Sequence, residues 1–297
     1  MTNTPPQTWD FRHFLATPPP NASFVPFHIP SEEEEEKLAR LIAYFGREGY
    51  VPPAVEAVGD ASGGEKAQVL SDWEMMFLSR EGIIRFLVAT RWNEQAAIQR
   101  LEKCLAWRRK TGIDDVQGVA DKVEAEYART GGQIILGWTE HANPVIVMQV
   151  NKRDTPPSSV GLLQLERLAI GAMVNIPWVI NLFLQAVYVF LDPVTKSKLV
   201  LNPSLRPAAP TTTTNGTTET TTSSTWPPSS LAQVIPPDQL LTQYGGARTL
   251  DWNEEVHERY WKALVEVSLD RRERAREKWA LMGGGVGRSE FEFKKGE

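Results

Sequence analysis

The sequence contains very little cysteine. Among its 297 residues Cys104 is the single cysteine, so no disulfide can form within the chain. The first residues also do not resemble a signal peptide, because they lack a basic flank followed by an apolar core. We therefore expect a reducing compartment, a cytoplasmic location and a flexible N-terminal arm over residues 1–30.

Patterns typical of catalysis are also missing. The sequence has no Gly-rich phosphate loop and no nucleophile motif, and one cysteine cannot build a metal site. Its four histidines are scattered at His13, His28, His141 and His257. These absences predict a protein that is not an enzyme and that uses no metal or other cofactor.

No basic block is interleaved with aromatic residues, which argues against a nucleic-acid partner for a chain with a net charge of −5. The densest basic run lies over residues 271–278. Acidic neighbours in the same helical pattern offset its charge, so we interpret it as a solvated helix face.

Charge is missing altogether from residues 168–191. About 20 apolar residues suffice to cross a bilayer, so a membrane-spanning helix is one reading of this segment. Pro177 would break such a helix. We favour a short buried strand over residues 173–176 followed by an apolar helix over residues 178–191, and we keep the membrane span as the alternative.

Helix and strand patterns are clear elsewhere in the chain. Ser31 and five glutamates predict a capped helix start, and Asn93 and Gly112 predict the two ends of another helix. A third long helix is expected from about Trp252 toward Met282. Shorter predicted elements are a hairpin over residues 133–138 and 144–150, a helix over residues 161–169, and a disordered Thr, Ser and Pro tract over residues 203–230.

Five runs of residues resemble those of one protein family, and they occur in the family's order. They are residues 83–92 with the helix ending at residue 112, residues 137–147, residues 175–178, residues 190–198 and residues 244–246. Together they cover most of residues 70–265. On these motifs the chain resembles the CRAL-TRIO lipid-binding and transfer proteins, in particular the fungal phosphatidylinositol-transfer branch.

The resemblance implies a mixed α/β fold. It places an N-terminal helical module over residues 31–115 and the lipid-binding domain over residues 116–282, with the tract over residues 203–230 as an insertion. A tail over residues 283–297 follows.

The resemblance also implies an apolar lipid pocket closed by a movable gate helix. The helix itself is apolar on almost every side. Its side chains expected to face lipid are those of Val179, Ile180, Phe183, Leu184, Val187 and Phe190. The implied ligand is phosphatidylinositol, exchanged against a second lipid such as phosphatidylcholine or a sterol. The protein is expected to be a monomer that contacts membrane surfaces transiently.

In that branch of the family, a hydroxyl donor and a lysine after the gate contact the inositol phosphate head group, and this implies such roles for Thr195 and Lys198. Thr90 stands where many members carry an arginine that helps to hold the phosphate. Arg91 follows it and is the residue that can substitute. The head-group candidates are therefore Thr195, Lys198, Thr90 and Arg91.

The chain departs from the family in the middle of the lipid-binding domain. Met173 runs directly into Val174, where family members have several dozen residues that include a central strand. We therefore expect a truncated sheet with exposed strand edges. Two alternatives to a lipid carrier stay open, namely a membrane-associated adaptor and a degenerate isoform without lipid-transfer activity.

Overall fold

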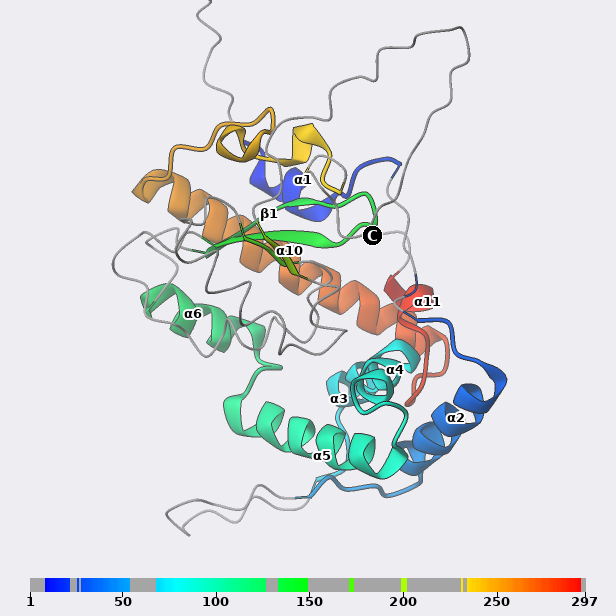
Figure 1. Cartoon of the computed structure of the whole chain (residues 1–297). Helices are drawn as coiled ribbons and strands as arrows, with labels where there is room; N and C mark the ends of the chain where they lie inside the picture. Colours follow the sequence, from blue (N-terminus) through cyan, green and yellow to red (C-terminus); the bar gives the residue numbers. More distant parts are fainter. Residues whose placement is uncertain are drawn as a thin grey trace, which may run out of the picture. The chain divides into compact units, whose positions relative to one another are not determined.

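The computed structural model of the chain describes residues 9–21, 26, 28–53, 68–126, 133–148, 171–173, 199–201, 231 and 234–294. The chain divides into two compact units (Figure 1). The first comprises Met1–Ser23 and Tyr127–Tyr260, and the second comprises Phe24–Glu126 and Trp261–Glu297. Helices and paired strands are both present, which confirms the predicted mixed α/β class.

The second unit is helical in its described residues. Its elements are α2 (Glu32–Gly46), α3 (Asp72–Phe77), α4 (Arg80–Ala89), α5 (Glu94–Thr111), α6 (Val116–Glu126), most of α10 (Glu254–Leu281) and α11 (Glu290–Lys294). The predicted helix ends are confirmed. The Ser31 side chain caps α2, the Asn93 side chain caps α5, and Gly112 ends α5 in the left-handed conformation with φ 64°.

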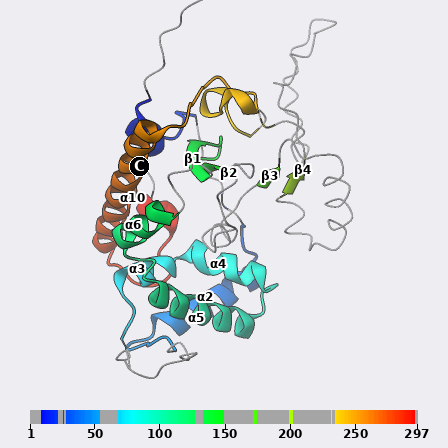
Figure 2. The ribbon, with the colours of Figure 1, turned by 90° about the vertical axis from the view of Figure 1, so that its left-hand side faces the viewer.

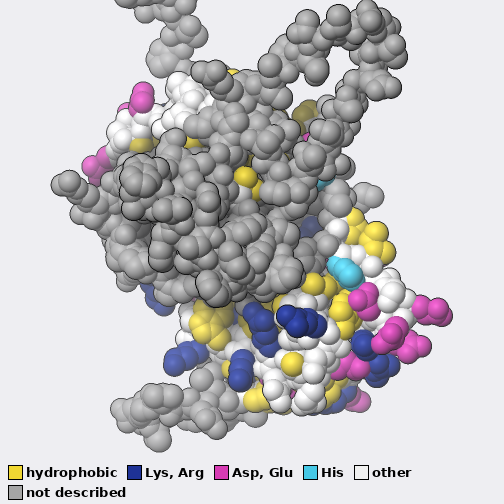
Figure 3. Space-filling view, viewed as in Figure 1, with side chains coloured by type: hydrophobic (Ala, Val, Ile, Leu, Met, Phe, Trp, Pro, Cys, Tyr) yellow, Lys and Arg dark blue, Asp and Glu magenta, His cyan; other side chains and the backbone are white. Residues whose placement is uncertain are grey.

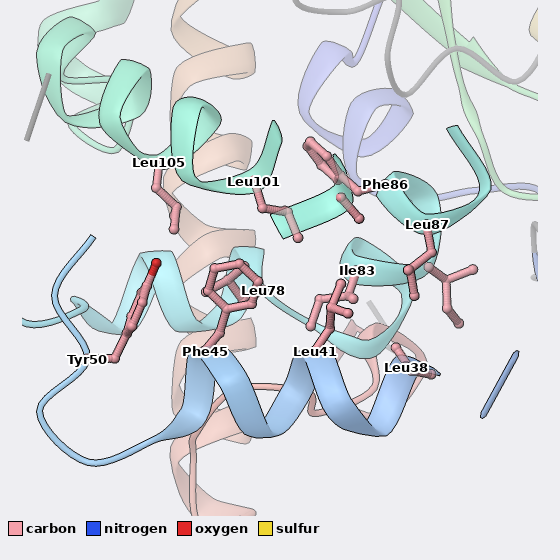
Figure 4. Close-up of a cluster of buried hydrophobic side chains, with 12 residues drawn as sticks. Leu38, Leu41, Phe45, Tyr50, Leu78, Ile83, Phe86, Leu87, Leu101 and Leu105 are labelled. Carbon is pink, nitrogen blue, oxygen red and sulfur yellow. The ribbon is translucent and has the colours of Figure 1, made fainter. Parts of the chain in front are cut away.

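Apolar side chains of α2, α4 and α5 form the main core of this unit. Figure 4 shows them pointing toward one another from the three helices. Leu41, Ile83 and Leu101 are each at most 1% exposed. Burial of this kind stabilises a fold by about 2 kcal/mol for each large aliphatic side chain. The helices of this unit are therefore fixed by a shared apolar interior.

The C-terminal residues pack onto α4. The backbone N–H of Gly287 donates to the carbonyl of Leu78 over 2.9 Å, and the Glu290 carboxylate accepts from the Ser79 hydroxyl over 2.7 Å. Phe293 is fully buried against Met76 and Trp279. Residues 283–294 of the predicted tail are thus an ordered part of the second unit.

The described strands belong to the first unit and form two ladders (Figure 2). β1 (Gln133–Trp138) pairs antiparallel with β2 (Pro144–Met148), which confirms the predicted hairpin. β3 (Gly171–Met173) pairs in parallel with β4 (Leu199–Leu201). The remaining described elements are the short 3-10 helices η3 (Pro237–Gln239) and η4 (Thr242–Tyr244), the helix α1 (Phe11–Ala16) and the start of α10.

The N-terminal residues differ from the flexible arm that we predicted. Phe11, Phe14 and Leu15 of α1 are buried. The indole N–H of Trp138 donates to the carbonyl of Phe14 over 3.0 Å, and the Trp9 indole donates to the carbonyl of Thr249 over 2.8 Å. Apolar burial and these two hydrogen bonds hold α1 in the first unit. Local sequence patterns cannot reveal contacts between residues so far apart in the sequence.

Several predicted elements lie outside the described residues. They are the helix over residues 161–169, the apolar helix over residues 178–191 and the Thr, Ser and Pro tract over residues 203–230. The predicted strand over residues 173–176 is described only at Met173, where β3 ends.

A buried ion pair joins α3 to α5. The Glu74 carboxylate, on a residue only 3% exposed, accepts from Nε and Nη2 of Arg109 over 2.6 and 2.9 Å and from the N–H of Ser71 over 2.9 Å. Burial opposes ionisation, but the hydrogen bonds from Arg109 and Ser71 outweigh it and hold the pKa of Glu74 below its ordinary value of 4.5. The pair therefore stabilises the fold only while Glu74 is charged.

We predict that Glu74→Gln lowers the free energy of unfolding by about 2 kcal/mol at neutral pH, because Arg109 loses its charged acceptor. The stabilisation is fully present above the unfolded-state pKa near 4.5 and is lost as the pH falls through the lower folded-state pKa. Urea unfolding at a series of pH values should show the wild type approaching the variant in acid. Glu48→Gln, at an exposed carboxylate, serves as the control, and a pH-independent difference would contradict the prediction.

Candidate functional site

Thr90 lies at the C-terminal end of α4, in the second unit. Its hydroxyl lies within donating distance of the carbonyls of Phe86 and Leu87, at 3.0 and 3.1 Å, and of the carbonyl of Asn93, at 3.3 Å. The hydroxyl has one hydrogen, so it donates to one of these carbonyls at a time. Thr90 is therefore the C-cap of α4, and its hydroxyl group donates to the backbone rather than to a ligand.

Arg91 follows in an uncommon backbone conformation. Arg91 and Trp92 both have positive φ, 53° and 59°, although neither is glycine. The Trp92 N–H donates to the carbonyl of Leu87 over 2.7 Å, and its ring lies 5.5 Å from that of His28. Trp92 packs on the core of the helical unit while Arg91 is exposed. The turn thus presents a guanidinium group to solvent directly beside Thr90.

The other predicted site residues lie outside the described residues. These are Thr195, Lys198 and the gate positions Val179, Ile180, Phe183, Leu184, Val187 and Phe190. The structure therefore places Thr90 and Arg91 side by side and leaves the remaining site assignments as predictions.

β3 and β4 bracket the predicted gate helix and head-group loop in sequence. They pair in parallel, with Gly171 opposite Leu199 and Met173 opposite Leu201. Parallel neighbours need a crossover connection of a dozen or more residues, which usually contains a helix. Residues 174–198 are the connection between β3 and β4. The extended backbone at residues 171–173 also excludes a single helix over all of residues 168–191. β4 begins directly after Lys198.

Two glycines of the first unit allow close approaches between backbone segments. The ladder has an irregular register between Ile135 and Trp138, and Gly137 in this bulge has φ 82°. A Cβ on Gly137 would lie 2.2 Å from the carbonyl oxygen of Gln239, and one on Gly246 would lie 1.9 Å from that of Leu240. An isolated glycine within a strand pattern is a sequence sign of such an approach, but our sequence analysis assigned Gly137 no role.

Tyr260, in α10, is a further residue that our sequence analysis missed. Its hydroxyl accepts from the N–H of Ile135 over 2.7 Å and donates to the carbonyl of the same residue over 3.0 Å. The ring is 2% exposed, and burial raises the pKa of Tyr260 well above its ordinary value. The hydroxyl therefore stays protonated and covers the side of β1 that faces away from β2.

Two kinds of site can be assessed over the described ranges alone. There, no cluster of three or more His, Cys, Asp or Glu side chains is arranged to hold a metal ion. None of the described helices combines the length and the apolar character that a bilayer crossing requires.

Comparison with known protein families gives two matches. The CRAL/TRIO, N-terminal domain matches residues 28–103, and the CRAL/TRIO domain matches residues 163–246. The first match contains Thr90 and Arg91. The second contains β3, β4, the predicted gate helix and the predicted head-group loop.

Two curated proteins are similar to the chain over nearly its whole length. The phosphatidylinositol transfer protein PDR17 of Saccharomyces cerevisiae is 28% identical, in an alignment that covers 93% of this chain and 88% of that protein. A CRAL-TRIO domain-containing protein of Schizosaccharomyces pombe is 26% identical, over 99% of this chain and 30% of that protein. The chain thus spans less than a third of the length of the Schizosaccharomyces pombe relative.

Both alignments are longer than the chain itself. They extend over 343 and 340 positions, whereas the chain has 297 residues, so at least 46 and 43 positions of the respective relatives have no counterpart. This size agrees with the several dozen residues that we predict to be missing after Met173.

We predict that Gly137→Ala destabilises the protein by about 3 kcal/mol, because an added Cβ meets the Gln239 carbonyl and a positive φ strains alanine. Urea unfolding measures the loss. Gly112→Ala is the matched control: Gly112 also has a positive φ, 64°, but nothing lies within 4 Å of its added Cβ, so about 1 kcal/mol is expected. Equal losses in the two variants would show that the close approach to Gln239 is not a constraint.

Proposed function

The chain belongs to the CRAL-TRIO family, and from this premise we propose that it binds phosphatidylinositol in an apolar pocket and exchanges it between membranes. CRAL-TRIO domains bind lipids, so lipid binding and transfer is the general activity that the comparisons support. The choice of phosphatidylinositol rests on the motif over residues 190–198 and on the similarity to a phosphatidylinositol transfer protein. We propose a carrier rather than an enzyme.

The observation that carries the proposal is the pair of family matches, which together contain every predicted site residue. The parallel pairing of β3 with β4 supports it further, because the connection between them is long enough to contain both a helix and a loop. We propose that residues 178–191 are the gate and that its apolar side chains contact the acyl chains.

We propose Thr195 and Lys198 as head-group residues, with the Lys198 ammonium group paired to the phosphate. At the end of α4 we favour Arg91 over Thr90. The Arg91 side chain is exposed, whereas the Thr90 hydroxyl donates to helix carbonyls and would have to give up that bond to donate to a phosphate.

Other features of the predicted protein stay part of the proposal. They are the domain boundaries 31–115 and 116–282, a monomeric state, phosphatidylcholine or a sterol as the exchanged lipid, and action from the cytoplasm at membrane surfaces.

Two observations favour a second candidate, a chain that has lost transfer activity. The described strands form two separate two-stranded ladders, and each relative has more than 40 positions without a counterpart here. A pocket without its central strand would expose apolar surface and hold lipid poorly. Native mass spectrometry of the purified chain separates the candidates, because a carrier retains bound phospholipid and a degenerate chain does not.

We predict that Lys198→Ala lowers the rate of phosphatidylinositol transfer between vesicles by roughly ten- to a hundredfold, since a charge-assisted hydrogen bond to the phosphate is lost. Lys196→Ala removes the same charge from the same loop and should transfer normally. Phosphatidylcholine transfer by both variants should stay close to that of the wild type. An equal loss in both variants would point to general electrostatics and away from a head-group contact.

A charge on the gate should expel the acyl chains. We predict that Phe183→Asp abolishes co-purification of phospholipid, because an ionised carboxylate is costly against hydrocarbon. The control is Gln185→Glu, which adds the same charge on the polar stripe of the predicted helix and should leave bound lipid in the mass spectrum. Retention of lipid by Phe183→Asp would contradict the gate assignment.

A further inference from the structure

The charged residues of α5 are divided between two sides of the helix. Both of its acidic residues engage α2 or the turn after it. Glu94 accepts from Nε and Nη2 of Arg40, each over 2.9 Å, and Glu102 accepts from the hydroxyls of Tyr44 and Tyr50 over 2.9 and 3.2 Å. The acidic groups of α5 are therefore used within the fold.

The other side of α5 carries only positive charge. Arg100, Lys103 and Lys110 are exposed and, at spacings of three and seven residues, lie on one face. The remaining positions of that face are Ala96, Gln99, Ala106 and the half-buried Trp107, so none is acidic. Arg91, exposed just before the helix begins, adds a fourth cation. We call Arg91, Arg100, Lys103 and Lys110 the basic stripe.

Three of the four cations of the stripe, Arg91, Lys103 and Lys110, form no ion pair with described residues. The basic run of α10 differs, because Arg276 pairs with Glu273 and Asp72, and Arg272 pairs with Asp114. Figure 3 shows Lys and Arg side chains gathered over α5 and Asp and Glu side chains gathered over α2. Four exposed cations thus lie on one face of α5 or directly before the helix, and Arg91, Lys103 and Lys110 take no ion pair among the described residues.

We propose that the basic stripe docks the protein on an anionic phospholipid bilayer. Arg100, Lys103 and Lys110 lie along one face of α5, and the ten residue steps of helix from Arg100 to Lys110 span about 15 Å, so these charges can reach a flat surface together. Each basic residue near such a surface strengthens binding about fivefold. Sites for single-stranded nucleic acid combine positive charge with exposed aromatic rings on which bases stack. The aromatic residue of this face, Trp107, is half-buried, which favours a bilayer over nucleic acid. The choice of a bilayer as the partner rests on the proposed function. The distribution of charge on α5 is an observation that is independent of that function.

The test uses the full chain and two double variants with equal net charge. Lys103→Gln/Lys110→Gln removes two charges from the stripe. Lys122→Gln/Lys262→Gln removes two exposed lysines elsewhere in the same unit. Arg91 is left unchanged because it is also a head-group candidate. Co-sedimentation is measured with vesicles of phosphatidylcholine alone and of phosphatidylcholine mixed with phosphatidylserine, at low and high salt.

We expect the wild type to bind the mixed vesicles, to release them at high salt, and to bind phosphatidylcholine vesicles weakly. The stripe variant should bind the mixed vesicles roughly 25-fold more weakly, and the control variant should bind like the wild type. Equal binding by the two variants, or equal binding to both kinds of vesicle, overturns the proposal. So does stripe-dependent binding of a single-stranded RNA probe without vesicle binding.

Failure of the proposed function gives a different result. Native mass spectrometry reports the lipid cargo of each variant, and the stripe variant should carry the same phospholipid as the wild type. A wild type that carries no lipid and still binds mixed vesicles through the stripe supports the docking surface while contradicting the carrier function. Loss of cargo in the stripe variant alone contradicts docking as the role of the stripe.

Discussion

Short strand ladders must find partners for the backbone groups along their open edges, and this constraint shapes the first unit. The N–H and C=O of Ile135 point away from β2 and would cost roughly 1–3 kcal/mol each if they were buried without partners. One hydroxyl, that of Tyr260, satisfies both. The side chain of a helix residue therefore pairs with the backbone groups of Ile135 as a neighbouring strand would.

A second constraint, the close approach of backbone segments, explains the glycines in β1 and in the segment of η3 and η4. The segment that contains η3 and η4 can lie against the hairpin at Gly137 because no side chain intervenes there, and the absence of a side chain at Gly246 lets the same segment fold back on Leu240. Gly245 ends η4 with φ 86°, which a residue with a side chain adopts only under strain. The Tyr244–Gly246 motif, first noticed as a family resemblance, thus has a physical reason that belongs to this fold.

Local signals in the sequence predicted the elements whose determinants are local. Asn93 and Gly112 marked the ends of α5, and short apolar runs rich in Ile, Leu and Val marked β1 and β2. The helix α1 was missed because six residues between prolines carry little helical signal, and its stability comes from contacts such as the bond from Trp138 to Phe14, 124 residues apart. Thr90 was predicted by position in a motif, which does not show that its hydroxyl donates to carbonyls of α4.

The basic stripe was missed for a related reason. The net charge of −5 suggests repulsion from an anionic surface, but at physiological salt fields are screened within about 8 Å, so a surface in contact with α5 senses that helix far more than the whole chain. The local charge of α5 therefore depends on where the partners of its acidic groups lie. Because Glu94 and Glu102 are held by Arg40 and the two tyrosines, they lie apart from the exposed cations, and only the folded arrangement shows this separation.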